Sequence, residues 1–266
     1  IFFRFIASDG DSATNQIHRD FQNYINTYDG KISDDFLDYI GKYSKPIPIS
    51  DWLHLLKNLR TRIIDNNIIL FNGSEIISIK EINDILHLDK IVTNARGRST
   101  MRDDIAIKLI NDESLSILGE NGQNCALVLM LPFVLFTIAI QSENLSIDAR
   151  KQLCLLSYDI IVNISKESEM LPNQKSKNAE NVGYLLNMMK IRTLNTIIGV
   201  AYALKDYNDH IMTSRLGTHI IEFIFGRMRN GCRGFDSLDQ CIYQLVKAEV
   251  TKETLEKFNK DDVPIL

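Results

Sequence analysis

The interpretation of the chain starts from the stretch Arg215-Leu-Gly-Thr-His-Ile-Ile-Glu-Phe-Ile-Phe-Gly-Arg-Met-Arg229. Thr218 is a favourable N-cap residue, and the residues after it predict a helix that is apolar on nearly every face. Such a helix is expected to be buried, yet Glu222 lies in its middle. A buried carboxylate is costly unless it is protonated, paired or bound to a cation. Glu222 therefore belongs either to a structural ion pair, with Arg227 or Arg215, or to a functional site.

The composition is that of a folded globular protein. The chain has 266 residues, of which 45% are hydrophobic and 24% charged, and its net charge is -4. This charge gives no global signature of nucleic-acid binding, so any such surface must be a local patch. The 4 cysteines form no CxxC pair, which indicates reduced intracellular thiols and no zinc site. Because the sequence begins Ile-Phe-Phe without a methionine, we expect it to be a piece of a longer protein.

The first part of the chain predicts strands alternating with helices. Residues 1–8 are apolar and β-favouring, and they end in the turn-rich acidic segment Asp9-Gly-Asp-Ser-Ala-Thr-Asn15. A helix is expected to begin near Thr14. A second short strand, of the edge type, is expected around Ile47 and Ile49, which alternate with proline and serine.

A helix from Trp52 to Ile64 should follow the second strand, with Asp51 as its N-cap. Its leucines follow helical spacing, whereas Lys57, Arg60 and Arg62 are expected elsewhere on its surface.

From about residue 65 onwards the pattern predicts helices and no further strands. The run from Cys125 to Ile140 is continuously apolar, but it is shorter than a membrane span and contains Pro132. A buried core helix is therefore expected there, and no membrane partner. The helices expected in this block are Ile79–Leu86, Thr100–Leu118, Ala126–Gln141, Ile147–Lys166 and Asn178–Asp206.

Asp9 and Glu222 offer carboxylates from distant parts of the chain, one at a strand end and the other on a buried helix. Two divalent ions about 4 Å apart need several hard oxygen ligands on rigid elements. The pair is therefore compatible with a two-metal phosphoryl-transfer site, although the chain has 34 acidic residues and two of them alone do not define one.

Four blocks of sequence, taken in order, resemble the P-element-like branch of the hAT-related DDE transposases. The blocks are Asp9 to Asn15, Asp51-Trp-Leu-His-Leu-Leu-Lys-Asn-Leu-Arg60, Thr100-Met-Arg-Asp-Asp-Ile-Ala106 and Gly217-Thr-His-x-x-Glu-x-x-Phe-Gly-x-x-Arg229. The resemblance covers most of the chain, is strongest in the second and fourth blocks, and is weak in the helical middle.

The resemblance implies an α+β fold that is mostly α: a partial RNase H-like core interrupted by a large all-α insertion domain. Residues 1–65 would belong to the core, 66–213 to the insertion, and 214–266 to the helical carboxyl-terminal part of the core. Asp51 and His54 match a family helix that supports the core, and this helix is interpreted as structural or adjacent to DNA.

The resemblance also implies the roles of the acidic residues. Asp9 corresponds to the second catalytic aspartate and Glu222 to the catalytic glutamate, and both would bind Mg²⁺ or Mn²⁺; Asp11 competes with Asp9 for its place. The first catalytic aspartate of the family lies upstream of the second, on a strand that the eight residues before Asp9 do not supply. Transposon DNA, a homo-oligomer and a nuclear location are further implications.

Two basic clusters are candidates for contacts with backbone phosphates. Ordinary solvated helix faces explain them equally well. His54 and His219 are weaker candidates for contacts with DNA or metal, since a histidine packed on a helix is at least as common. The clusters are Lys57, Arg60 and Arg62, and Arg227, Arg229 and Arg233.

Three functions remain open from the sequence. The favoured one is the core of a metal-dependent transposase that hydrolyses DNA phosphodiesters and transfers strands. The second is a transposase-derived, catalytically inactive domain that binds DNA or protein. The third is an unrelated helical scaffold, in which the carboxylates of Asp9 and Glu222 need not meet.

Overall fold

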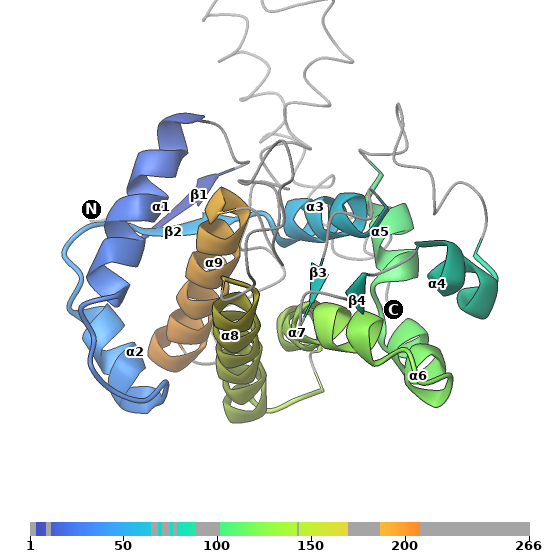
Figure 1. Cartoon of the computed structure of the whole chain (residues 1–266). Coiled ribbons are helices and arrows are strands. Elements are labelled where there is room, and N and C mark those ends of the chain that lie inside the picture. Colours follow the sequence, from blue (N-terminus) through green and yellow to red (C-terminus); the bar gives the residue numbers. More distant parts are fainter. Residues whose placement is uncertain are drawn as a thin grey trace, which may run out of the picture. The chain divides into compact units, whose positions relative to one another are not determined.

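The computed structural model describes residues 4–8, 12–64, 69–70, 75–76, 79–88, 102–142, 144–169 and 187–207. The described part is mostly helical with few strands (Figure 1), as the α+β, mostly α expectation requires. Its elements are β1 (Phe5–Ser8), α1 (Ser12–Ile25), α2 (Asp34–Gly41), β2 (Ile47–Ser50), α3 (Trp52–Ile64), β3 (Ile69–Leu70), β4 (Glu75–Ile76), α4 (Ile79–Leu86), α5 (Asp103–Leu109), α6 (Asp112–Glu120), α7 (Asn124–Gln141), α8 (Ile147–Glu169) and α9 (Asn187–Tyr207).

Strands β1 and β2 pair in parallel, with Phe5 opposite Ile47 and Ser8 opposite Ser50. Helices α1 and α2 form the connection between them, because parallel strands cannot be joined by a tight hairpin. Arg4 ties the start of β1 to the end of α2: its guanidinium donates to the carbonyl oxygens of Tyr43 at 2.6 Å and Gly41 at 2.9 Å. These bonds occupy carbonyl groups that the end of a helix leaves without helical partners.

Helix α9 packs against β2, and α1 packs against both. The close approach of α9 to the strand depends on Gly199, where a Cβ atom would lie 3.1 Å from Ile47 Cγ2 and 3.2 Å from Ile49 Cγ1. The strand predicted at Ile47 and Ile49 is confirmed, but all of its residues are buried. Alternating exposure is absent because two helices cover the strand.

The helix predicted from Trp52 to Ile64 is confirmed at both ends as α3. Asp51 is its N-cap, since Asp51 Oδ1 accepts a hydrogen bond of 2.9 Å from the backbone N–H of Leu53. The carboxylate thereby satisfies one of the donors that the first turn of a helix leaves unpaired.

The single helix predicted from Thr100 to Leu118 is wrong, because the structure has two helices there, α5 and α6. The chain breaks at Ile110, whose φ of -113° and ψ of 80° are not helical. Asn111 then starts α6, its side chain accepting a hydrogen bond of 2.7 Å from the N–H of Ser114. Asparagine competes in this way with the preceding helix for backbone donors.

Further differences lie near residue 70 and before β2. The antiparallel pair β3–β4 shows that strands do not stop at residue 65, contrary to the prediction. Helix α2 was not predicted. The helix Ile79–Leu86 is confirmed as α4. The helix predicted from Asn178 to Asp206 corresponds to α9, and its predicted start lies outside the described residues.

Helix α7 is the buried core helix expected for the apolar run, with Leu129, Met130 and Phe133 at most 1% exposed. Pro132 lies inside it, and the Pro132 carbonyl accepts a hydrogen bond of 2.6 Å from Ser157 Oγ of α8. No helix in the described ranges has the length and apolar character needed to cross a membrane.

One hydrophobic core joins α1, α2, β2 and α3 to the helices from α4 to α9. The chain divides into two compact units, 1–217 and 218–266, and every described residue belongs to the first. The domain boundaries expected at residues 65 and 213 remain predictions.

Candidate functional site

The carboxyl edge of the parallel strands is the place where the fold gathers helix starts. Ser8 ends β1 opposite Ser50, which ends β2, and α1 and α3 begin at Ser12 and Trp52. In α/β folds, ligands bind at this edge because helix N-termini and loop side chains converge there. Asp9 follows Ser8 in the sequence and lies outside the described residues.

A fully buried polar cluster lies behind this edge, formed by α1, β2 and α9. The side chain of Asn195 donates a hydrogen bond of 2.7 Å to the carbonyl of His18, and its Nδ2 lies 3.3 Å from His18 Nδ1. His18 Nε2 lies 3.3 Å from Ser50 Oγ, and the N–H of Ser50 donates to Thr196 Oγ1 at 2.9 Å. We call His18, Ser50, Asn195 and Thr196 the polar cluster.

The contacts of Asn195 indicate which ring nitrogen of His18 carries the proton. The atom of Asn195 that faces the His18 carbonyl must be the amide nitrogen, since two oxygens would repel. That nitrogen can only donate, so His18 Nδ1 is the acceptor and Nε2 carries the proton toward Ser50. Burial, together with the charge of Arg192, lowers the pKa of His18 to about 4, so the ring is neutral at physiological pH.

The basic cluster predicted on the surface of α3 is not there. Arg60 is 0% exposed and Arg62 7%, and desolvation holds the pKa of Arg60 below its usual range. Lys57 Nζ forms an ion pair of 2.8 Å with Asp103 Oδ1 of α5. The surface location predicted for Arg60 and Arg62 is therefore wrong, because packing against other parts of the chain covers the polar side of α3.

The same ion pair brings two of the quoted sequence blocks together. Helix α3 carries most of the block from Asp51 to Arg60, and α5 begins at Asp103 in the block from Thr100 to Ala106. The two helices pack against each other, and Lys57–Asp103 joins them. His54 lies half-buried on α3.

The remaining predicted site residues lie outside the described residues, so their roles stay predictions. Within the ranges that the structure describes, no group of three or more His, Cys, Asp or Glu side chains is placed to hold a metal ion. The expected Mg²⁺ or Mn²⁺ site therefore depends on Asp9, Asp11 and Glu222, which lie outside these ranges. The second basic cluster, Arg227, Arg229 and Arg233, lies outside them as well and stays a prediction for contacts with DNA.

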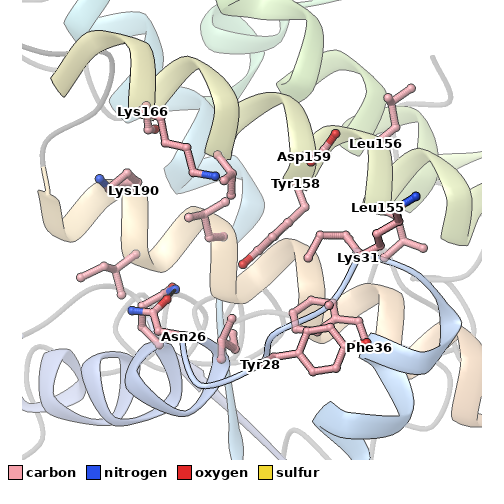
Figure 2. A pocket seen from close by; sticks show the side chains of 18 of the residues that line it. Asn26, Tyr28, Lys31, Phe36, Leu155, Leu156, Tyr158, Asp159, Lys166 and Lys190 are labelled. Atoms are coloured by element: carbon pink, nitrogen blue, oxygen red, sulfur yellow. Dashed lines mark hydrogen bonds between the residues drawn. The ribbon is translucent and has the colours of Figure 1, made fainter. Parts of the chain in front are cut away.

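A second feature, an open groove of about 980 Å³, runs between α1 and the turn after it on one side and α8 and α9 on the other. Figure 2 shows Tyr158 of α8 pointing into the groove, with Tyr28 and Phe36 near one end and Lys166 and Lys190 near the other. Leu156 is 49% exposed and lines the same groove. The groove has both basic and apolar walls.

Sequence reasoning missed both the polar cluster and the groove. For His18 a signal existed, because His18, Phe21 and Ile25 recur at helical spacing and all are buried. A histidine on such a stripe is expected in the interior. The groove has no comparable signal, since its walls come from residues more than a hundred positions apart.

Comparison with known proteins adds no relative: no protein-family model, no curated protein and no solved structure matches the chain.

Proposed function

We propose that this chain is part of the core of a metal-dependent DDE-type DNA transposase. The observation that supports the proposal best is the parallel pairing of β1 with β2, which brings both strand ends, Ser8 and Ser50, to one edge. Asp9 is the next residue after Ser8, and Asp51 after Ser50 starts the helix that matches the family block. The strand–helix–strand order agrees with a partial RNase H-like core.

The proposed chemistry is hydrolysis and strand transfer at DNA phosphodiesters. Asp9, or Asp11 in its place, and Glu222 would bind Mg²⁺ or Mn²⁺ together with an aspartate from an upstream strand. The ions would activate water or a DNA 3′-hydroxyl and stabilise the leaving oxygen. The helices from α4 to α9 separate β2 and α3 from Glu222 in sequence, as an insertion before the last catalytic residue would.

A transposase-derived protein without catalysis is the second candidate, and one observation favours it. Arg60 and Arg62 are buried and Lys57 is paired, so α3 presents little positive charge to DNA. The groove beside α8 offers instead a surface on which a protein could dock.

The test is Mn²⁺-dependent nicking of supercoiled plasmid DNA by the full-length protein. Glu222→Gln should abolish nicking, because the amide cannot supply a negatively charged ligand, while the far-ultraviolet circular dichroism stays unchanged. Glu113→Gln, on an exposed position of α6, is the matched control and should nick normally.

Nicking that survives in Glu222→Gln would remove Glu222 from the mechanism. If the unaltered protein binds plasmid DNA but never nicks it, the inactive candidate is favoured. If it neither binds nor nicks DNA, the unrelated scaffold is favoured.

A further inference from the structure

The groove between α1 and α8 differs in charge from the chain as a whole. The side chains that line it include four basic residues, Arg19, Lys31, Lys166 and Lys190, and one acidic residue, Asp159. The complete chain, in contrast, has a net charge of -4. A local positive surface on a negative protein favours an anionic partner.

The positive groups lie at both ends of the groove. Figure 2 shows Lys166 and Lys190 at one end, on α8 and α9, and Lys31 toward the other end, in the turn after α1. Lys31 and Lys166 are exposed. This spacing suits an extended ligand with several negative charges better than a single small anion.

The apolar wall of the groove is mainly aliphatic where it is accessible. Leu156 is 49% exposed, and Ile32, Val162 and Ile191 are half-buried. Phe36 and Tyr158, by contrast, are 1% and 4% exposed, so their ring faces are occupied within the protein. Tyr28 is half-buried, and its ring packs against the rings of Phe36 and Tyr39, with both pairs of centroids 5.0 Å apart.

This distribution separates two classes of anionic partner. Single-stranded nucleic acids bind through bases stacked on exposed aromatic rings. Phe36 and Tyr158 are buried, and the ring of Tyr28 already packs on two other aromatic rings. An amphipathic peptide helix binds by placing aliphatic side chains in a groove between helices, and it can carry carboxylates along its flanks. The accessible surface fits the peptide.

We propose that the groove binds an acidic amphipathic helix of a partner protein. The apolar side chains of that helix would pack on Leu156 and its aliphatic neighbours, and its carboxylates would face Lys31 and Lys166 at the two ends. The inference does not depend on catalysis by Asp9 and Glu222, because the groove is formed by α1, α8 and α9 and the turn after α1.

The probe is a fluorescein-labelled helical peptide of about 18 residues, or five turns, with leucines along one face and glutamates elsewhere. Fluorescence anisotropy at low salt should show saturable binding with a Kd on the order of 10 µM. A peptide of the same composition with scrambled leucine positions should bind at least about tenfold more weakly, because it has no continuous apolar face.

Two pairs of variants locate the binding. Leu156→Asn should weaken binding about tenfold, whereas Leu145→Asn, at an exposed leucine outside the groove, should not. Lys166→Glu should weaken binding about fivefold and remove much of its salt dependence, whereas Lys108→Glu on α5 should have little effect. All four positions are exposed, so the variants should fold, as circular dichroism would check.

Several results would overturn the proposal. The first is no peptide binding at about 1 mM, and the second is an equal loss of affinity in a groove variant and its control. The third is a single-stranded DNA oligonucleotide that binds more tightly than the peptide and whose affinity falls in the Lys166→Glu variant. The last is a dimer in sedimentation that Leu156→Asn dissociates, which would assign the groove to a second copy of the chain.

Discussion

Helices α1 and α9 each contribute to two regions that contrast in their relation to water. On one side, His18 of α1 and Asn195 of α9 lie in the polar cluster, both 0% exposed. On the other, Arg19 of α1 and Lys190 of α9 line the open groove. Neighbouring residues of one helix thus serve a closed polar interior and an open basic surface. The contrast teaches that polarity by itself does not indicate a surface site.

The largest effect is expected where α9 closes over β2. Gly199→Val should lower the free energy of unfolding by about 3 kcal/mol, because the new Cβ would already lie 3.1 Å from Ile47 Cγ2 and its methyl groups need further room. Urea denaturation measures this loss. An unchanged midpoint would mean that α9 does not pack on the strand at this distance.

The pH dependence of stability should report the neutral state of His18. Its folded pKa of about 4 lies below the unfolded value of 6.5, so the unfolded chain takes up the proton first as the pH falls. The contribution of His18 to the free energy of unfolding is therefore complete above pH 6.5 and decreases progressively toward pH 4. About 2 kcal/mol of it should be lost between pH 7 and pH 5.

Urea denaturation at a series of pH values tests this dependence. His18→Gln is the matched variant, since it keeps a polar side chain but cannot titrate, and its stability should vary much less over the same interval. An equal decrease in both proteins would show that other groups cause the pH dependence.

The hydrogen bond between α9 and β2 should have a smaller effect on stability, which threonine-to-valine substitutions at two positions of α9 can test. Thr196→Val removes the acceptor of the buried Ser50 N–H and should cost about 1 kcal/mol. Thr193→Val, one turn earlier, should be neutral or slightly stabilising, because Thr193 Oγ1 is buried and has no hydrogen-bond partner among the residues that the structure describes. Thermal melts of the two variants should shift in different directions or by clearly different amounts.

The smallest effect is expected on the open side. Leu156→Asn should change the free energy of unfolding by less than about 0.5 kcal/mol, because its side chain is 49% exposed. Leu155→Asn, one residue before it and 5% exposed, should cost about 3 kcal/mol through lost packing and an added buried amide. Similar losses in both would show that Leu156 is covered.

Much of the local structure was predictable because the signals are short-range. Asp51 indicates the start of α3, and the leucine spacing after it indicates a helix, so both ends of that element are confirmed. The break before α6 is not predictable from the apolar pattern. It depends on the side chain of Asn111, which accepts the hydrogen bond of the Ser114 N–H in place of a backbone carbonyl.

Burial was much less predictable. Arg60 and Arg62 lie off the leucine stripe of α3, so the pattern placed them on the surface, but they are buried. The stripe reports the strongest apolar face and cannot report what distant segments cover the other faces. The site residues Asp9 and Glu222 stay predictions, since their meeting would depend on contacts between the ends of the chain.

The hydrogen bond from Ser157 to the carbonyl of Pro132 has a consequence for the alignment of α7 and α8. Two interfaces of leucine and isoleucine can slide past each other by one turn, about 5.4 Å, with little change in contact energy. The hydrogen bond from Ser157 to Pro132 would break if α8 slid along α7 by one turn, so it opposes that movement. Because Ser157 directly follows Leu156 in sequence, the same bond also fixes the axial position of Leu156 relative to α7.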